Sequence, residues 1–279
     1  MDQLKADFCL RVATLYRSRS SIPVFADGNW QQGFERAEKI SKVTSLIITA
    51  GKYVHIQAKC RGTTVDVSDQ NYLHLFTKDH QIFRVEVNLN DSDERQDRCR
   101  YEDILRHLQP FMNVYELYVK LQGFGSRAIF SYLSPILNQL PKGSYRSMTM
   151  DYCGLPASCF MRHVYNNSQL FYLNLDSGWP ASFIQSTEIA IRTHPLRHIY
   201  LAGSSELAIG IETFTNLMIR LSDDEDERPY RCSLFCSGSH SSLKHLFTQY
   251  QRKVSKKSMV SHKKISWRMK GDKIVECYI

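Results

Sequence analysis

The chain has 279 residues and a formal net charge of +8, and 43% of its residues are hydrophobic. This composition excludes a disordered chain, and the length suffices for a buried core in one long domain or two. Charged residues occur throughout the first twenty positions, and no apolar stretch approaches the length of a membrane span. The sequence therefore predicts a protein of the cytoplasm or nucleus without a membrane contact, with its eight scattered cysteines as reduced thiols.

The first 110 residues have two different patterns. Apolar residues at helical spacing predict a helix over Asp7–Ser18, and a more polar helix is expected over 31–40, so residues 1–40 form a helical segment. Residues 41–110 are expected as a small α+β region, with a helix over 101–108. Runs of strand-forming residues lie at 43–49, 53–58, 63–67 and 81–89. Gly51-Lys52 predicts a hairpin turn between the first two runs.

The second half, residues 111–279, contains an internal repeat. Several segments fit one template, in which the first, fourth and sixth positions are apolar. Four of them begin at Val114, Tyr145, Leu170 and Leu196, and a weaker fifth begins at Arg231. The alternation within each template predicts a short strand. Between the strands, helical faces are expected at 129–137, 160–164, 183–191, 214–221 and 243–250.

Strand and helix alternating in units of about 20–29 residues are typical of leucine-rich repeats. The predicted fold class is therefore α/β: an irregular leucine-rich-repeat-like solenoid of parallel strands and helices, preceded by the smaller α+β region. An ordinary parallel α/β sheet is the alternative, because it also alternates strand and helix and because no unit shows a clear Asn or Cys ladder residue. A final β-hairpin, 265–269 with 273–279, is expected to cap the open end of the solenoid.

Short motifs near both ends of the sequence resemble a known family. They are Met1-Asp2, Phe8-Cys9 with Val12 and Leu15, Trp30 ahead of the first β-rich run, and the closing Ser266-Trp267-Arg268 with Gly271-Asp272-Lys273. In these motifs the chain resembles the F-box-associated families that are expanded in nematodes. The resemblance implies a substrate-recognition protein, with residues 1–40 as a degenerate F-box-like segment for a ubiquitin-ligase adaptor. The chain departs from an F-box where Leu4-Lys5-Ala6 lacks a proline.

Catalytic motifs are not recognisable, so the sequence predicts no enzyme and no cofactor. Gly123-Phe124-Gly125 lacks the other residues of a phosphate-binding loop, and no Gly-x-Ser-x-Gly motif occurs. The cluster with the most nearly suitable metal spacing is Cys232, Cys236, His240 and His245. Cys236 and His240 are too close together for the two ligand pairs of a zinc finger. We therefore predict core positions for both cysteines and no metal site, with zinc as the alternative.

A basic segment lies between residues 252 and 273. The residues of this basic patch are Arg252, Lys253, Lys256, Lys257, Lys263 and Lys264. Three interpretations stay open: a solvated loop and sheet edge, a targeting or partner-binding patch, and a nucleic-acid-binding surface of a nuclear regulatory protein. Trp267 and Tyr278 are too few aromatic residues for a platform on which bases would stack.

The polar positions of the repeat strands form the predicted partner-binding site. Side chains at alternate positions of neighbouring parallel strands align on one face, and aromatic and hydrogen-bonding groups on a rigid face are typical of protein-binding hot spots. The predicted residues are Glu116, Tyr118, Lys120, Ser147, Thr149, Tyr172, Asn174, His198 and Tyr200. The sequence therefore predicts a non-enzymatic protein-binding module, with nucleic-acid binding through the basic segment as the alternative.

Overall fold

A computed structural model gives the structure of the chain over most of its second half and parts of its first. The residues it describes are 45–50, 54–60, 63–67, 81–90, 101–122, 129–141, 145–176, 178–201, 206–223, 230–237, 245, 259–260, 264–269 and 273–278. The helical segment predicted for residues 1–40 lies outside these ranges, as do the basic residues from 252 to 263 and the helix predicted over 243–250, apart from His245.

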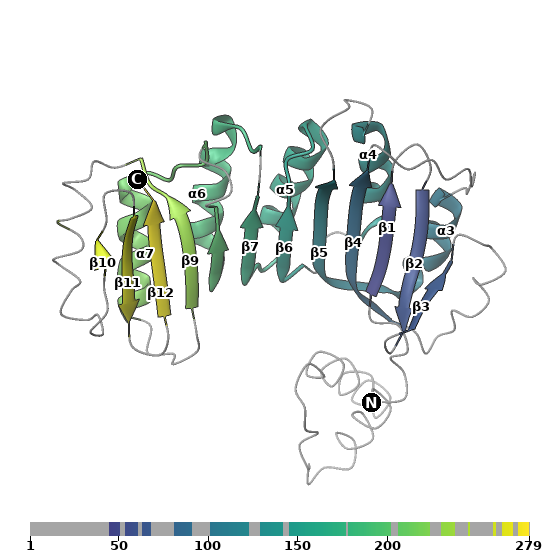
Figure 1. Cartoon of the computed structure of the whole chain (residues 1–279), viewed down its shortest axis with the longest axis horizontal. Helices are drawn as coiled ribbons and strands as arrows, with labels where there is room; N and C mark the ends of the chain where they lie inside the picture. The colour runs from purple at the N-terminus through teal and green to yellow at the C-terminus, as the bar shows by residue number, and fades with distance from the viewer. Residues whose placement is uncertain are drawn as a thin grey trace, which may run out of the picture.

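The described residues form one mixed sheet of twelve strands with five α-helices (Figure 1). The strands are β1 (Ser45–Ala50), β2 (Val54–Cys60), β3 (Thr63–Asp66), β4 (Ile82–Asn90), β5 (Met112–Gln122), β6 (Ser147–Met150), β7 (Tyr172–Leu175), β8 (His198–Tyr200), β9 (Tyr230–Phe235), β10 (Met259–Val260), β11 (Lys264–Met269) and β12 (Lys273–Tyr278). The helices are α3 (Tyr101–Leu108), α4 (Ile129–Gln139), α5 (Leu155–Asn167), α6 (Ile184–Thr193) and α7 (Ile211–Asp223). Short 3-10 turns, η2 (Gln109–Phe111) and η3 (Ala181–Phe183), precede β5 and α6.

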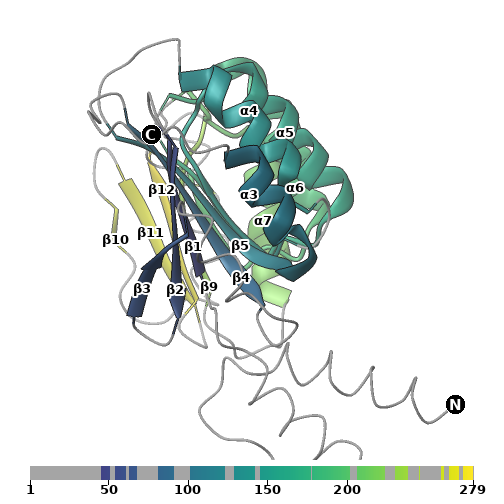
Figure 2. The ribbon, with the colours of Figure 1, turned by 90° about the vertical axis from the view of Figure 1, so that its right-hand side faces the viewer.

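The middle of the sheet follows the order of the chain. Strands β4 to β9 lie side by side and are parallel, with one helix between each strand and the next. The four template segments are therefore neighbouring parallel strands, as predicted. All five described helices pack on the same face of the sheet (Figure 2). The sheet stays open at both ends of its strand order, β10-β11-β12-β9-β8-β7-β6-β5-β4-β1-β2-β3. The predicted α/β class is confirmed at the level of one large, mostly parallel, open sheet.

Antiparallel strands form both ends of the sheet. At one end, β1 pairs antiparallel with β2 and β2 with β3, which confirms the predicted pairing of the first two strand runs; the turn predicted at Gly51-Lys52 lies outside the described residues. Strand β1 also pairs in parallel with β4, and β4 pairs in parallel with β5, so the sheet runs without interruption from the 41–110 region into the 111–279 region. At the other end, β11 and β12 form the predicted final hairpin, and β12 pairs in parallel with β9.

The fifth template was assigned in the wrong register. In the structure Cys232 lies opposite Ile199, and the Leu201 N–H donates to the Ser233 carbonyl at 2.7 Å. Cys232 therefore holds the fourth template position, which the sequence pattern had given to Leu234. The shift is by an even number of residues, and side chains alternate along a strand, so the same residues still face the core.

The core lies between the sheet and the helices. One buried row crosses the sheet in register and contains Leu117, Met148, Leu173, Ile199 and Cys232. The helices add their predicted apolar faces, among them Phe160 and Val164 on α5 and Phe214 and Met218 on α7. The polar residues that alternate with this row consequently lie on the opposite side of the sheet.

Local sequence explains how β6 leads into α5. Gly154 has a φ angle of 82°, in the left-handed region that glycine adopts without strain. Its carbonyl accepts hydrogen bonds from the Ala157 and Ser158 N–H groups at 3.1 and 3.3 Å, which starts the helix. Pro156 lies in the first turn, where a backbone N–H would have no partner within the helix.

His194 ends α6 in a buried position that makes stability depend on pH. Burial lowers the pKa of its imidazole from the usual value of 6.5, although a hydrogen bond with the Tyr165 backbone raises that pKa in part. With this lowered pKa, the folded state binds fewer protons than the unfolded chain near and below pH 6.5. We therefore expect the free energy of unfolding to have its full value above about pH 6.5 and to fall as the pH drops below it. Urea midpoints at pH 7.5 and 5.5 test this expectation.

The matched variant for that measurement is His194→Gln, which removes the titrating group and keeps a polar side chain. We expect the variant to lose less stability than the wild type between the two pH values. An equal pH dependence in both proteins would show that His194 does not control it.

Candidate binding surface

The face of the sheet opposite the helices carries rows of polar side chains in register. The first row contains Arg84, Glu116, Ser147, Tyr172, His198 and Arg231. The second row contains Glu86, Tyr118, Thr149, Asn174, Tyr200 and Ser233. We call these two rows the open face, because the five described helices lie on the other side of the sheet (Figure 2). Eight of the nine predicted partner-binding residues belong to it, and the ninth, Lys120, lies opposite Asn88 in the next row.

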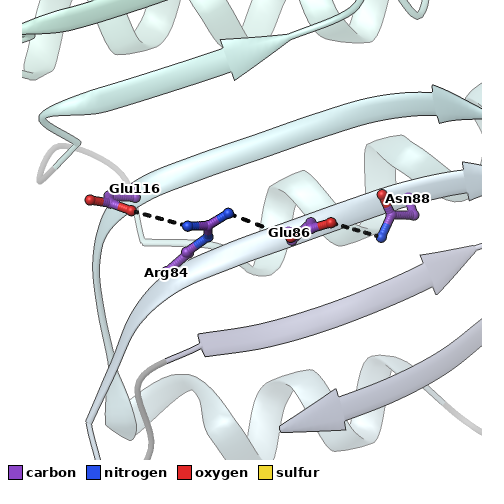
Figure 3. A network of polar contacts seen from close by, with 4 residues as sticks. All are labelled: Arg84, Glu86, Asn88 and Glu116. Carbon is purple, nitrogen blue, oxygen red and sulfur yellow. Dashed lines mark hydrogen bonds and ion pairs between the residues drawn. The ribbon is translucent and has the colours of Figure 1, made fainter. Parts of the chain in front are cut away.

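A network of charged groups occupies the β4–β5 part of the open face (Figure 3). The two terminal nitrogens of Arg84 lie 3.7 Å from the Glu86 carboxylate and 3.9 Å from the Glu116 carboxylate. Glu86 also accepts a hydrogen bond from the Asn88 amide at 3.2 Å. The Arg84 guanidinium lies 4.2 Å from the centre of the Tyr118 ring. One guanidinium here therefore lies between two carboxylates.

This network is expected to contribute little to folding, because its ion pairs are partly exposed to water. Such pairs are worth about 0–1 kcal/mol each. We therefore expect Arg84→Gln to lower the free energy of unfolding by less than about 1 kcal/mol, as measured by urea titration. A loss of several kcal/mol would show that the network is a main support of the sheet.

Aromatic rings form the centre of the open face. Tyr172 lies between two neighbours on β8, with its ring centre 5.6 Å from Tyr200 and 5.9 Å from His198. Burial, and then the nearby Tyr200, raise the pKa of Tyr172. Burial, and then Arg197 and Arg231, lower the pKa of His198. The cluster therefore favours uncharged rings, half-buried and held by one another on rigid strands.

Outside the two rows of the open face, another row of aromatic and arginine side chains lies where the parallel strands begin. The Arg146 guanidinium lies 5.8 Å from the Tyr115 ring centre and 5.7 Å from the Phe171 ring centre, and Phe83 stacks on Tyr115 at 5.8 Å. Backbone hydrogen bonds join Tyr115, Arg146, Phe171 and Arg197 in this order across the sheet. The site prediction missed this row, although the sequence carries its signal: these four residues all follow the first apolar position of a template.

The cysteines that were considered for metal binding lie on the helix side of the sheet. Cys232 and Cys236 are both buried, which confirms their predicted core positions. Burial raises the pKa of the Cys232 thiol, which disfavours the thiolate that a metal would need. His245 is exposed, and His240 lies outside the described residues. Among the residues that the structure describes, no group of three or more His, Cys, Asp or Glu side chains is arranged to hold a metal ion.

Two further observations concern membranes and known proteins. None of the described helices is long and apolar enough to cross a lipid bilayer. Comparison with protein-family models, curated proteins and solved structures found no match to this chain.

Proposed function

We propose that this protein is a non-enzymatic interaction module that binds another protein on the open face of its sheet. The observation that carries the proposal is the alignment of aromatic and hydrogen-bonding side chains in register over six parallel strands. Rigid strands hold these side chains in place before binding, so little conformational entropy is lost when a partner docks. Tyrosines at the centre of such a face are typical binding hot spots.

The finer architecture that we propose is a leucine-rich-repeat-like solenoid. Two observations support this architecture. Consecutive strands β5 to β9 are neighbours in the sheet, and the helices that connect them all lie on the same side of it (Figure 2). Such repeats use the exposed positions of their strands for binding. The final hairpin then acts as a cap, since β12 continues the sheet from β9 and β11 and β10 continue it antiparallel.

The resemblance to the F-box-associated families leads us to propose that the bound protein is a substrate for ubiquitin transfer, in the cytoplasm or the nucleus. In this proposal the open face recognises the substrate, and residues 1–40 contact the ligase adaptor. The alternative, a nucleic-acid-binding nuclear protein, depends on the basic residues from Arg252 to Lys264, of which the structure describes only the backbone of Lys264.

Affinity capture from cell extract with a surface variant tests the proposed function. Asn174 lies between Thr149 and Tyr200 at the centre of the open face, so Asn174→Arg places a bulky charge there. The control is Ile189→Ala on α6, where the side chain is 54% exposed on the helix side. We expect the wild type and the control to retain the same partner and Asn174→Arg to lose it. Recovery of an adaptor subunit in the same capture would support the ligase proposal.

Capture by all three proteins alike would contradict binding on the open face. Loss of the partner only in Ile189→Ala would move the site to the helices. Circular dichroism melting of each variant separates loss of binding from loss of folding.

A further inference from the structure

Three buried cysteines lie together where the final hairpin joins the repeat sheet. Cys232 lies on β9, Cys236 directly follows that strand, and Cys277 lies on β12, which pairs with β9 (Figure 1). All three are thiols in the structure, and none is more than 5% exposed. They occupy the buried positions of alternating strands, so they lie on the helix side of the sheet. The binding surface proposed above uses none of them.

Cys236 and Cys277 are in contact with each other. Cys277 lies opposite Leu234 in the register of the two strands, and Cys236 is the next residue along the chain that shares this face. The Cys236 N–H donates to the Tyr278 carbonyl at 3.0 Å, and the Cys277 thiol donates to the same oxygen at 3.7 Å. A hydrogen bond also joins the two thiols. The fold therefore holds two sulfur atoms side by side that are far apart in the sequence.

The surroundings keep the Cys277 thiol protonated but leave a route for an oxidant. The hydrogen bond with Cys236, and then burial, raise the pKa of Cys277. The thiolate is the reactive form, so this raised pKa slows oxidation. The regular pairing of β9 and β12 ends at Phe235 and Tyr278, next to both cysteines. Strand ends open more readily than strand centres, and such an opening exposes the sulfur atoms.

We propose that Cys236 and Cys277 form a reversible disulfide that fastens the final hairpin to the repeat sheet under oxidising conditions. The oxidant is a small-molecule disulfide such as oxidised glutathione. Cys236, the more exposed of the pair, loses its proton and attacks one sulfur of the oxidant, which forms a mixed disulfide and releases one thiol. Cys277 then loses its proton and attacks the Cys236 sulfur, which closes the internal disulfide and releases the second thiol. The protein loses two electrons and two protons, and the oxidant gains both.

This disulfide acts as a lock on the last strands of the sheet. Cys277 follows Glu276, which lies opposite Ser233 in the second row of the open face. A covalent bond between Cys236 and Cys277 therefore fixes the register at this end of the open face. It also lowers the conformational entropy of the unfolded chain, and this effect grows with the number of residues between the two cysteines. In a reducing compartment such a bond forms only transiently, so the lock responds to the redox state.

Mass spectrometry of the oxidised full chain tests the proposal. The folded protein is incubated with oxidised glutathione, the remaining thiols are blocked with iodoacetamide, and the protein is digested with trypsin without reduction. Trypsin places Cys277 in the peptide 274–279 and both Cys232 and Cys236 in the peptide 232–244. We expect the two peptides to be linked, fragmentation to place the link at Cys236, and dithiothreitol to separate them.

Thermal unfolding then measures the strength of the lock. We expect oxidation to raise the melting temperature of the wild type by at least about 4 °C, which is a low value for a disulfide in a chain of this size. Cys236→Ala is expected to show neither the link nor the shift. Cys232→Ala is the matched control, because Cys232 is a buried cysteine of the same strand, and it should show both. The mass spectrum of the wild type needs no variant, so it decides the question if an alanine variant does not fold.

Four results would overturn the proposal. A glutathione adduct that never resolves into an internal link, or a link from Cys277 to Cys232, would show that Cys236 and Cys277 are not a redox pair. Absence of oxidation at both residues in the folded protein would show the same. A link that leaves the melting temperature unchanged would show that the disulfide does not lock the sheet. Capture of a partner on the open face is measured separately and does not depend on any of these results.

Discussion

Replacing Trp179 with alanine is expected to lower the free energy of unfolding by about 3–5 kcal/mol, the range for removing a large aromatic side chain from a core. Trp179 is fully buried and follows β7 at the point where the chain turns toward α6. Its ring centre lies 4.6 Å from Phe183 and 5.4 Å from Tyr152. The indole N–H donates to the Met150 carbonyl at 2.8 Å, so this one side chain joins β6 to the η3–α6 segment.

Urea denaturation followed by circular dichroism measures this effect, with Trp179→Phe as the matched control. Phenylalanine keeps most of the apolar contact but removes the indole N–H, and the Met150 carbonyl keeps its hydrogen bond from the Asp176 N–H at 3.2 Å, so the lost hydrogen bond costs about 0.5–1.5 kcal/mol. The alanine variant should therefore be clearly the less stable of the two. A loss below about 1 kcal/mol for alanine would contradict the packing described here.

The double substitution Tyr172→Ala/Tyr200→Ala is expected to weaken partner binding by at least about 100-fold, or about 2.7 kcal/mol. The two rings are in contact at the centre of the open face, and tyrosines in such positions contribute a large share of binding energy. Titration calorimetry with the captured partner measures the change. Leu155→Ala is the control, because Leu155 is 75% exposed on α5, on the helix side.

The stability of the double variant decides how a loss of binding is interpreted. Both tyrosines are only half-buried, so their removal is expected to shift the urea midpoint much less than Trp179→Ala does. Undiminished affinity in a folded double variant would place the partner elsewhere on the protein. A loss of affinity in Leu155→Ala instead would point to the helix side.

The sequence predicts the parallel part of the sheet because the same local hydrophobic pattern recurs in each unit. The templates at Val114, Tyr145, Leu170 and Leu196 combine strand alternation with an intervening helical face, and a short right-handed crossover makes consecutive strands neighbours. The fifth template was placed two residues too far along, because a shift of two leaves every side chain on the same face. Hydrophobic pattern alone does not fix that register.

Other parts of the structure required long-range pairing that no local pattern contains. Strand β1 lies between β2 and β4, so its parallel pairing with β4 joins the antiparallel strands β1, β2 and β3 to the repeat sheet. The polar positions of the predicted site followed from alternation alone. The pairing of Arg231 with His198 could not be predicted in this way, because it depends on the register between β8 and β9.

Hydroxyl-radical footprinting of the protein with and without its captured partner tests the central claim most directly, because it compares the two sides of the sheet in one experiment. Oxidation is measured at Tyr172, Tyr200 and His198 on the open face and at Leu155, Ile189 and Ile219 on the helices, where these three side chains are 75%, 54% and 42% exposed. We predict that the partner lowers oxidation of the first set and leaves the second unchanged. Protection of the helix residues with the tyrosines still oxidised would contradict binding on the open face.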